Sequence, residues 1–365
     1  SLDRRQRQMC IRDRCLRLSS NWLSGTGLRK LLSLVFAGFS VSGYASVDLS
    51  GTYNVATLTP LERPAVFGNM QFLSREQAEK LRRDDAAAKA ERGNKSDPER
   101  GAPPSGGDGS AGAAGNVGGY NTFWIDNGSN AFQLDGKFRT SILTQPENGR
   151  RPELTAEAIV KFAQARRNRR NNSGTAWWLD DRGLGPGPYD DMEQRPLAER
   201  CILGFGPVAG PPMFPTLYNN LKRIIQTEDS IMILAEMVHD ARIIRLNSAP
   251  RPRHIRTWLG DSIGHWEGDT LVVETKNFTQ RPALYGADEN LRVIERFKRV
   301  DEQTLSYSFE VTDPTVWTAS WGGEYPWPAT EEKVYEYACH EGNYALGNIM
   351  RGARLLEAEA ISQFE

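Results

Sequence analysis

The sequence from Trp258 to Phe278 reads WLGDSIGHWEGDTLVVETKNF. It contains two strand-like runs, Ile263–Trp266 and the β-branched Thr270–Phe278. The turn residues Glu267–Asp269 separate the two runs, an arrangement typical of an antiparallel β-hairpin. Similar runs lie on both sides of this stretch. The second half of the chain is therefore predicted to be a meander of short antiparallel strands.

The strand pattern continues through most of the chain after Cys201. It is clearest in Thr304–Thr312, where Leu, Tyr, Phe and Val alternate with Ser and Glu. About eight strands with tight connections predict a mainly β fold, a lipocalin-like barrel without open sheet edges. A two-sheet sandwich is the alternative, because Ile231–Leu234 is apolar on both faces. The expected strands are Leu221–Gln226, Ile231–Met237, Ala241–Leu246, Ile263–Trp266, Thr270–Phe278, Leu291–Val300, Thr304–Thr312 and Glu332–Cys339.

The first 45 residues are set apart from the fold. Residues 1–14 have no hydrophobic period and resemble translated adaptor sequence, so we interpret them as non-native read-through. Residues 15–45 combine the basic pair Arg29-Lys30, a short apolar run and small residues up to Ala45, which is the pattern of a cleaved signal peptide. A membrane anchor is the alternative, but the run is much shorter than the roughly 20 residues that span a bilayer. We expect a periplasmic or secreted protein with no stable membrane insertion after cleavage.

Residues 46–92 are predicted to hold a first strand and a solvated helix. The strand is expected within Asp48–Leu58. Ser74 followed by Gln77 forms a capping box that opens the helix Arg75–Arg92, which is rich in good helix formers and poor in apolar positions.

The remaining segments differ sharply in composition. Residues 93–119 form a Gly-rich tract with little to bury, and we expect a flexible linker or exposed loop. Residues 120–355 are the predicted barrel domain, in which Asp135-Gly136 marks a two-residue hairpin turn. A second peripheral helix is expected from Thr155 to about Asn172, and residues 356–365 are expected to form a tail.

Charge and cysteine content narrow the range of partners and compartments. The formal net charge is −1, but the first 45 residues are basic, so the remainder is acidic. An acidic protein lacks the basic face that neutralises phosphates, and we expect no nucleic-acid partner. Two cysteines, Cys201 and Cys339, lie beyond the signal segment, and export predicts that they form a disulfide. Two buried thiols that never meet are the alternative.

Five motifs together carry a resemblance to a known family. Between Asp48 and about Arg354, the chain resembles a family of exported bacterial proteins of unknown activity. The resemblance implies export, and it supplies no catalytic residues that can be carried over. The motifs are TPLERP (Thr59–Pro64), ERCILGFG (Glu199–Gly206), EMVHDARII (Glu236–Ile244), GHWEGDTLVVETKNF (Gly264–Phe278) and YACHEGNY (Tyr337–Tyr344).

His239 is the first candidate catalytic residue. Strand alternation from Ile231 places it on an apolar face, at the mouth of the predicted barrel, with Asp240 beside it. A carboxylate next to an imidazole fixes its tautomer and supports its charged form, which is the basis of general acid–base catalysis. A histidine that caps the hairpin and bonds to local backbone is the alternative.

A second candidate group follows Cys339. His340 and Glu341 come directly after it, and a disulfide there would hold their backbone rigid, as a catalytic group requires. Tyr344 adds a hydroxyl group for ligand binding. The alternative is a simple turn that pivots at Gly342.

Glu295 is a further catalytic candidate because it shares a strand face with Val293 and Phe297. A carboxylate on an inward face must find a partner or shift its pKa, and such groups are enriched at functional sites. Arg242 is a candidate binding residue. Either Arg242 or Arg256 could instead form a purely structural pair with Glu295.

The tryptophan residues are the last sequence feature that indicates a binding site. Trp266 in the central hairpin is a candidate binding residue, because flat rings stack on sugars and aromatic ligands, and small-molecule pockets are mostly apolar. In a β-rich protein the alternative is that tryptophans such as Trp266 simply fill the core.

These residues support two functional hypotheses. The first is an exported enzyme that binds a saccharide, glycoside or aromatic compound and transforms it by lyase, isomerase, hydratase or hydrolase chemistry, with His239 and His340 moving protons and Glu295, Asp240 or Glu341 orienting them. The second is a non-catalytic binding module for a hydrophobic ligand. Two histidines facing one cavity would favour the enzyme. No cofactor is predicted, although His239, His340 and an acid could hold a divalent metal as a two-His-one-carboxylate set.

Overall fold

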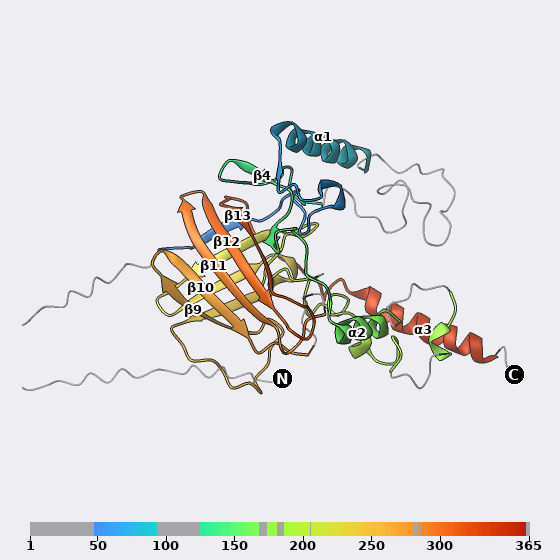
Figure 1. The fold of residues 1–365 in the computed structure, drawn as a ribbon. Helices are drawn as coiled ribbons and strands as arrows, with labels where there is room; N and C mark the ends of the chain where they lie inside the picture. The colour runs from blue at the N-terminus through green and yellow to red at the C-terminus, as the bar shows by residue number, and fades with distance from the viewer. Residues whose placement is uncertain are drawn as a thin grey trace, which may run out of the picture. The chain divides into compact units, whose positions relative to one another are not determined.

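Ten strands join into one curled, mostly antiparallel sheet that forms a half-barrel (Figure 1). Its strand order is β1-β6-β7-β8-β9-β10-β11-β12-β13-β5. The prediction of a mainly β fold is confirmed, and because the ten strands share one sheet, the alternative two-sheet sandwich does not form. The strands are β1 (Gly51–Asn54), β5 (Leu143–Gln145), β6 (Leu221–Gln226), β7 (Ser230–Ala235), β8 (Ala241–Leu246), β9 (Asp261–Glu267), β10 (Thr270–Lys276), β11 (Arg292–Asp301), β12 (Thr304–Thr312) and β13 (Trp321–Pro328).

The computed structural model describes residues 47–92, 125–167, 174–180, 186–204, 206–280, 284 and 286–362. These residues all belong to one unit, Ala45–Glu365. The interpretations of residues 1–14, 15–45 and 93–119 lie outside the described residues, as does the end of the second predicted helix after Arg167.

The central hairpin forms as the sequence predicts. Strand β9 pairs antiparallel with β10, with Trp266 opposite Leu271. Gly268 has a φ of 63° in the turn, a conformation that glycine adopts without steric cost. In β12, buried and half-buried residues alternate from Thr304 to Thr312, which confirms the predicted period of two.

A second, three-stranded sheet contains the other predicted hairpin. Strands β3 (Gln133–Leu134) and β4 (Lys137–Arg139) flank Asp135 and Gly136, and β4 also pairs with β2 (Phe72–Leu73). Asp135 and Gly136 both have positive φ, as a tight hairpin turn requires.

The meander breaks between β8 and β9, which pair in parallel, with Ile244 opposite Ser262. A parallel pair needs a connection that carries the chain back to the same end of the sheet. Residues 247–260 provide it, and this stretch contains Pro250 and Pro252, which cannot donate to a strand ladder. The expected run of antiparallel hairpins is therefore interrupted here.

The last predicted strand, Glu332–Cys339, has no regular secondary structure, and β13 takes its place in the sheet. The sequence of β13, WGGEYPWP, contains glycines and prolines that normally indicate turns. Its partner β5 reaches only Gly322 and Gly323, so Pro326 lies on a free strand edge, where a missing N–H is tolerated. Beyond β13, one bridge joins Ala329 to Tyr53 of β1 and brings the two ends of the curled sheet together.

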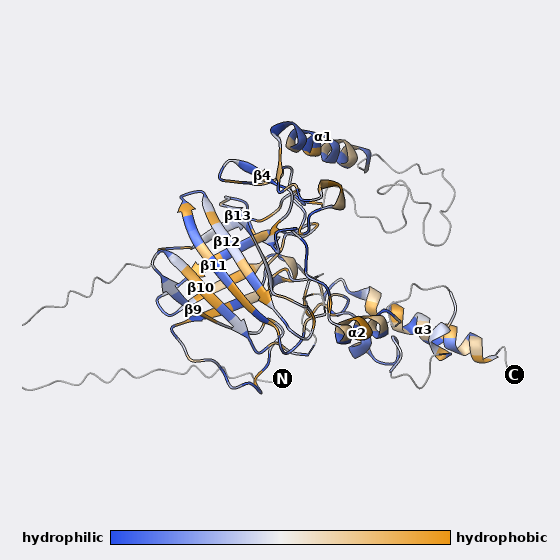
Figure 2. Cartoon of the chain, viewed as in Figure 1, coloured by the Kyte–Doolittle hydropathy of each residue, from blue (hydrophilic) through white to orange (hydrophobic). Residues whose placement is uncertain are grey.

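Among the described residues, three α-helices lie outside the sheet. α1 (Arg75–Arg92) has the predicted bounds and opens with the predicted reciprocal hydrogen bonds between Ser74 and Gln77. α1 is mostly hydrophilic along its length (Figure 2). α2 (Ala156–Arg167) is the second predicted helix, and α3 (Tyr344–Ser362) is a third that the sequence analysis missed, since residues 356–365 were expected to be a tail.

Aromatic side chains fill the interior of the half-barrel. Tyr53, Phe297 and Trp327 are fully buried, and the ring of Trp327 packs against those of Tyr53 and Phe297. The segment that enters from outside the sheet at Met213 and Phe214 completes this core, and Phe214 packs edge-on against Phe309 at 5.2 Å between ring centres. These rings occupy much of the inward face, and the predicted cavity for ionisable side chains within the rolled sheet stays a prediction.

Arg242 and Glu295 form an ion pair inside this core. The Arg242 guanidinium donates two hydrogen bonds to the Glu295 carboxylate, at 2.5 and 3.0 Å. Tyr307 donates to the same carboxylate at 2.8 Å and accepts the backbone N–H of Met213 at 2.9 Å, and Tyr325 donates to the carbonyl oxygen of Met213. Burial raises the pKa of both phenols, so they remain protonated donors. Arg242, rather than Arg256, is thus the partner of Glu295.

Glu295→Gln tests how much this ion pair contributes to the free energy of unfolding. The amide keeps the shape of the carboxylate but leaves the Arg242 charge buried without a counter-ion. We expect a loss of about 3–5 kcal/mol in the free energy of unfolding, measured by urea titration. Glu310→Gln, on the adjoining strand β12 and half-buried, is the matched control and should change stability by less than about 0.5 kcal/mol. Equal stabilities of the two variants would contradict a structural role for the pair.

Candidate functional site

A pocket of about 1180 Å³ lies beside the disulfide, and none of its lining residues belongs to the main aromatic core. Its wall includes the start of β6, the turn after β7, residues 331–339 and the first turns of α3. Apolar and aromatic side chains supply much of this surface, among them Tyr218, Leu221, Tyr335, Tyr337, Leu346 and Ile349.

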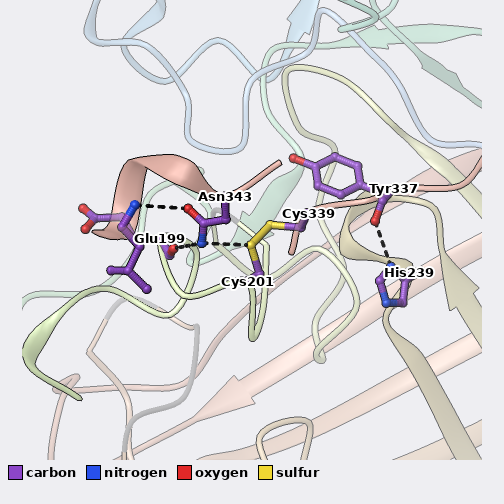
Figure 3. The surroundings of a disulfide bond; sticks show 7 residues. Glu199, Cys201, His239, Tyr337, Cys339 and Asn343 are labelled. Atoms are coloured by element: carbon purple, nitrogen blue, oxygen red, sulfur yellow. Dashed lines mark hydrogen bonds between the residues drawn. A yellow bond between two sulfur atoms is a disulfide. The ribbon is translucent and has the colours of Figure 1, made fainter. Parts of the chain in front are cut away.

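The disulfide between Cys201 and Cys339 holds one side of the pocket in place (Figure 3). The two cysteines are 138 residues apart in sequence and 5.7 Å apart between Cα atoms, which confirms the predicted bridge. Asn343 reinforces the junction, since its side-chain amide donates to the carbonyl oxygen of Glu199 at 2.8 Å and approaches Cys201 Sγ at 3.4 Å. Because residues 331–338 lack regular secondary structure, the bridge is a principal constraint on this wall.

Acidic side chains dominate the charge of the pocket. Six acids line it against one lysine, Lys333. Burial, followed by the nearby charges of Glu332 and Glu236, raises the pKa of Asp126. The crowding of like charges means that a bound cation would be attracted to this wall. The acids are Asp126, Glu199, Glu236, Glu331, Glu332 and Glu336.

Lys222 of β6 lies behind this wall and was not identified from sequence. Its side chain is fully buried, on the same strand face as the core residue Ile224, and its Nζ has no hydrogen-bond partner among the described residues. Burial lowers the pKa of Lys222 to about 7, against the opposing attraction of Glu236 and Asp240. The sequence signal that could have indicated a buried lysine is its position two residues before Ile224, on the same face of the strand.

Glu236 connects Lys222 to the pocket. Its carboxylate lies on the pocket wall and accepts the backbone N–H of Tyr335 at 3.0 Å. Its own backbone N–H donates to the carbonyl oxygen of Leu221, the neighbour of Lys222, at 3.0 Å. The charge of Glu236, a residue of the pocket lining, thus acts on the buried amine.

Asp240 is the second acid whose charge acts on Lys222. Burial raises the pKa of Asp240 to about 6, although His239, Lys222 and the backbone of Gly204 favour its charged form. A carboxyl group with this pKa can carry a proton near neutral pH.

His239 does not lie on the apolar face where strand alternation placed it, because β7 ends at Ala235. Val238 and His239 have φ values of 60° and 46°, so the chain turns out of the strand and exposes the imidazole. Its Nδ1 lies 3.0 Å from the carbonyl oxygen of Tyr337 (Figure 3). Since a carbonyl oxygen only accepts, Nδ1 carries the proton. This bond to backbone matches the alternative interpretation of His239 more closely than a place inside a cavity.

The other predicted site residues lie away from the pocket lining. His340, Glu341 and Tyr344 are exposed, and none of them is among the residues that line the pocket. Trp266 packs against the main core, which is the alternative anticipated for the tryptophans. The charges of His239 and Lys222 both act on Asp240, but the structure does not bring the full predicted set into one site. The catalytic roles of these residues stay predictions.

One motif escaped the sequence analysis. Residues 260–264 read GDSIG, which has the G-x-S-x-G spacing of a nucleophile elbow. Ser262, however, lies within β9, is buried, and shares a hydrogen bond of 2.8 Å with Thr275 Oγ1. A nucleophile elbow places its serine on an exposed strand-to-helix turn, so this spacing does not mark a catalytic serine here.

Neither a metal cluster nor a membrane span was found in the part of the chain that the structure describes. No three His, Cys, Asp or Glu side chains in the described ranges are arranged to hold a metal ion. No described helix has both the length and the apolar character to cross a membrane.

Lys222→Met tests whether the buried amine lowers the free energy of unfolding. The folded-state pKa of about 7 is below the usual 10.5, so the folded protein binds fewer protons than the unfolded chain between these pH values. Wild-type stability should rise with pH across that window and be lowest below pH 7. Methionine removes the penalty, and we expect a gain of about 1–3 kcal/mol at pH 6 that shrinks toward pH 10, measured by urea unfolding. The exposed-site control Lys298→Met should show no such trend, and a loss of stability for Lys222→Met at pH 6 would contradict the assignment.

Comparison of the chain with models of protein families, with curated protein sequences and with solved structures gave no match. The resemblance to a family of exported bacterial proteins therefore stays a prediction from the five motifs. The lining of the pocket and the buried Lys222 are the features that bear on function.

Proposed function

We propose that the protein is a binding module for a small organic cation with an aromatic or apolar body, which it holds in the pocket beside the disulfide. The observation that carries this proposal is the lining of that pocket, where tyrosines and aliphatic side chains stand among six carboxylates. A pocket of about 1180 Å³ is at the upper end of the range for drug-sized ligands.

The chemistry of the lining favours a cation over a neutral or anionic ligand. Tyrosine rings such as those of Tyr218 and Tyr337 attract positive charge through their faces. A cation near Asp126, Glu236 and Glu332 would also relieve the repulsion that these carboxylates exert on one another. The apolar residues of the lining would cover the body of the ligand.

Export to the periplasm or the cell exterior is part of the proposal. The disulfide is consistent with an oxidising compartment, and the predicted signal peptide and the family resemblance both point to export. The role would resemble that of a lipocalin-like carrier built on a curled sheet, although the ligand would lie beside the sheet and not within it.

Acid–base transformation of the ligand is the second candidate function. The specific observation in its favour is Asp240, whose pKa of about 6 suits proton transfer, next to His239 with its Nε2 available as a base. In this candidate the originally predicted helpers His340 and Glu341 would lie at the edge of the site, and Glu295 would act only through the stability of the core.

Titration calorimetry with benzyltrimethylammonium tests the binding proposal. At pH 7.5 we expect a dissociation constant on the order of 0.1 mM, and much weaker binding of benzyl alcohol, which keeps the ring but not the charge. The raised pKa of Asp126 means that this carboxyl group takes up a proton at a higher pH than an ordinary aspartate, so the affinity should fall as the pH is lowered.

Variants locate the binding site. Asp126→Asn combined with Glu332→Gln should weaken binding of benzyltrimethylammonium by about tenfold, the effect of roughly 1.4 kcal/mol. Glu302→Gln, an exposed acid in the β11–β12 turn, is the control and should bind as wild type does. If benzyltrimethylammonium gives no saturable heat, or if benzyl alcohol binds equally well, the proposed ligand class is wrong.

A further inference from the structure

Lys222 is the buried reactive group that simple ligand binding leaves unused. Its side chain has 0% exposure, and Nζ has no hydrogen-bond partner among the described residues. An ammonium ion without partners in such a place costs several kcal/mol, whereas a neutral amine costs far less. A costly side chain of this kind is a candidate for chemistry that needs a free amine.

We propose that Lys222 captures a carbonyl-bearing ligand of the pocket by forming an imine through its Nζ atom. The inference rests on the proposed function insofar as the ligand enters through the same pocket. It adds a covalent step and a ligand class, an aldehyde or ketone, to the non-covalent recognition described above.

The reaction needs no reagent other than the amine and the carbonyl compound. The lone pair of Nζ attacks the carbonyl carbon, a C–N bond forms, and the carbonyl oxygen takes up a proton. Nitrogen then loses a proton, the oxygen takes a second one and leaves as water, and a C=N bond forms as an iminium ion. Loss of the second proton from nitrogen gives the neutral imine. Amine and carbonyl compound thus give imine and water, with no change of oxidation state.

The flanking carboxyl groups suit these proton transfers. Asp240 and Glu236 are the two acids whose charges act on Lys222. Asp240 can be protonated near neutral pH, so it can give a proton to the leaving oxygen, and its carboxylate can take one from nitrogen. Burial also keeps about half of the Lys222 amine unprotonated at pH 7, whereas an ordinary lysine is almost fully protonated there.

Access from the pocket runs past Glu236. Lys222 and Leu221 are on opposite faces of β6, and Leu221 lines the pocket while Lys222 does not. Glu236, whose charge acts on Lys222, lines the pocket, and its carboxylate accepts the backbone N–H of Tyr335, in a stretch without regular secondary structure. A rotation of this one side chain would open the amine to the ligand, and a cationic ligand that attracts Glu236 would favour that rotation.

Reductive trapping tests the proposal on the full protein. The probe is 4-(trimethylammonio)benzaldehyde, which joins the proposed cation to a carbonyl group, and cyanoborohydride converts any imine to a stable amine for peptide mapping by mass spectrometry. At pH 7 we expect labelling of Lys222 at least about tenfold faster than that of the exposed Lys276 and Lys298. Lys222→Met should lose this adduct, and Lys298→Met should keep it.

The outcomes separate this inference from the proposed function. Labelling confined to exposed lysines would overturn the inference, and if benzyltrimethylammonium still binds, the non-covalent proposal stands without it. Fast labelling of Lys222 that benzyltrimethylammonium does not slow would support the reactive amine and count against the proposed pocket ligand. Asp240→Asn should slow the labelling of Lys222 while the exposed lysines react as before, and unchanged labelling would remove Asp240 from the proton transfers.

Discussion

The buried pair of Arg242 and Glu295 is the constraint on which the rest of the fold depends. It joins β8 to β11 across the interior of the curled sheet, and Tyr307 extends it to the backbone of Met213. Since a buried charge without its counter-ion is strongly unfavourable, the sheet must curl far enough to bring the two side chains together. Tyr307, which donates to the carboxylate, and Tyr325, which donates to the carbonyl oxygen of Met213, fill the space around the pair. The carboxylate on this inward strand face therefore has a structural partner, and the pocket beside the disulfide is lined by other residues.

The disulfide lies in the wall of the pocket outside the sheet. Residues 331–338 are not part of a strand ladder, and the bridge from Cys339 to Cys201 holds this stretch together with the hydrogen bonds of Tyr335 to Glu236 and of Tyr337 to His239. The pocket forms between this stretch and the end of the sheet, where β6 and the turn after β7 present Glu236. The pocket lining is acidic and contains three tyrosines, and the charge of its Glu236 acts on the buried amine of Lys222. The proposed ligand recognition and the proposed imine formation therefore involve different residues.

Much of the fold could be predicted from the sequence because its signals are local. The hairpin at Gly268, the alternation in Thr304–Thr312, the capping box at Ser74 and the cysteine pair each depend on a few neighbouring residues or on compartment. The predictions fail where the chain departs from the regular alternation of inward and outward residues along a strand. β13 is hidden by its glycines and prolines, and His239 is turned out of its strand by two residues with positive φ. Lys222 was missed because a single lysine in the strand LKRIIQ does not reveal which face is inward until the partner strands are known.

The most direct test of the account is to find where a ligand binds. A crystal soaked with 4-bromobenzyltrimethylammonium would show the bromine by its anomalous signal. The account predicts a single site beside the disulfide, with the ammonium group near Glu236 and the ring against the tyrosines of residues 335–337. Density for the ligand inside the curled sheet, among Tyr307 and Trp327, would contradict it, because that space is assigned to the closed aromatic core.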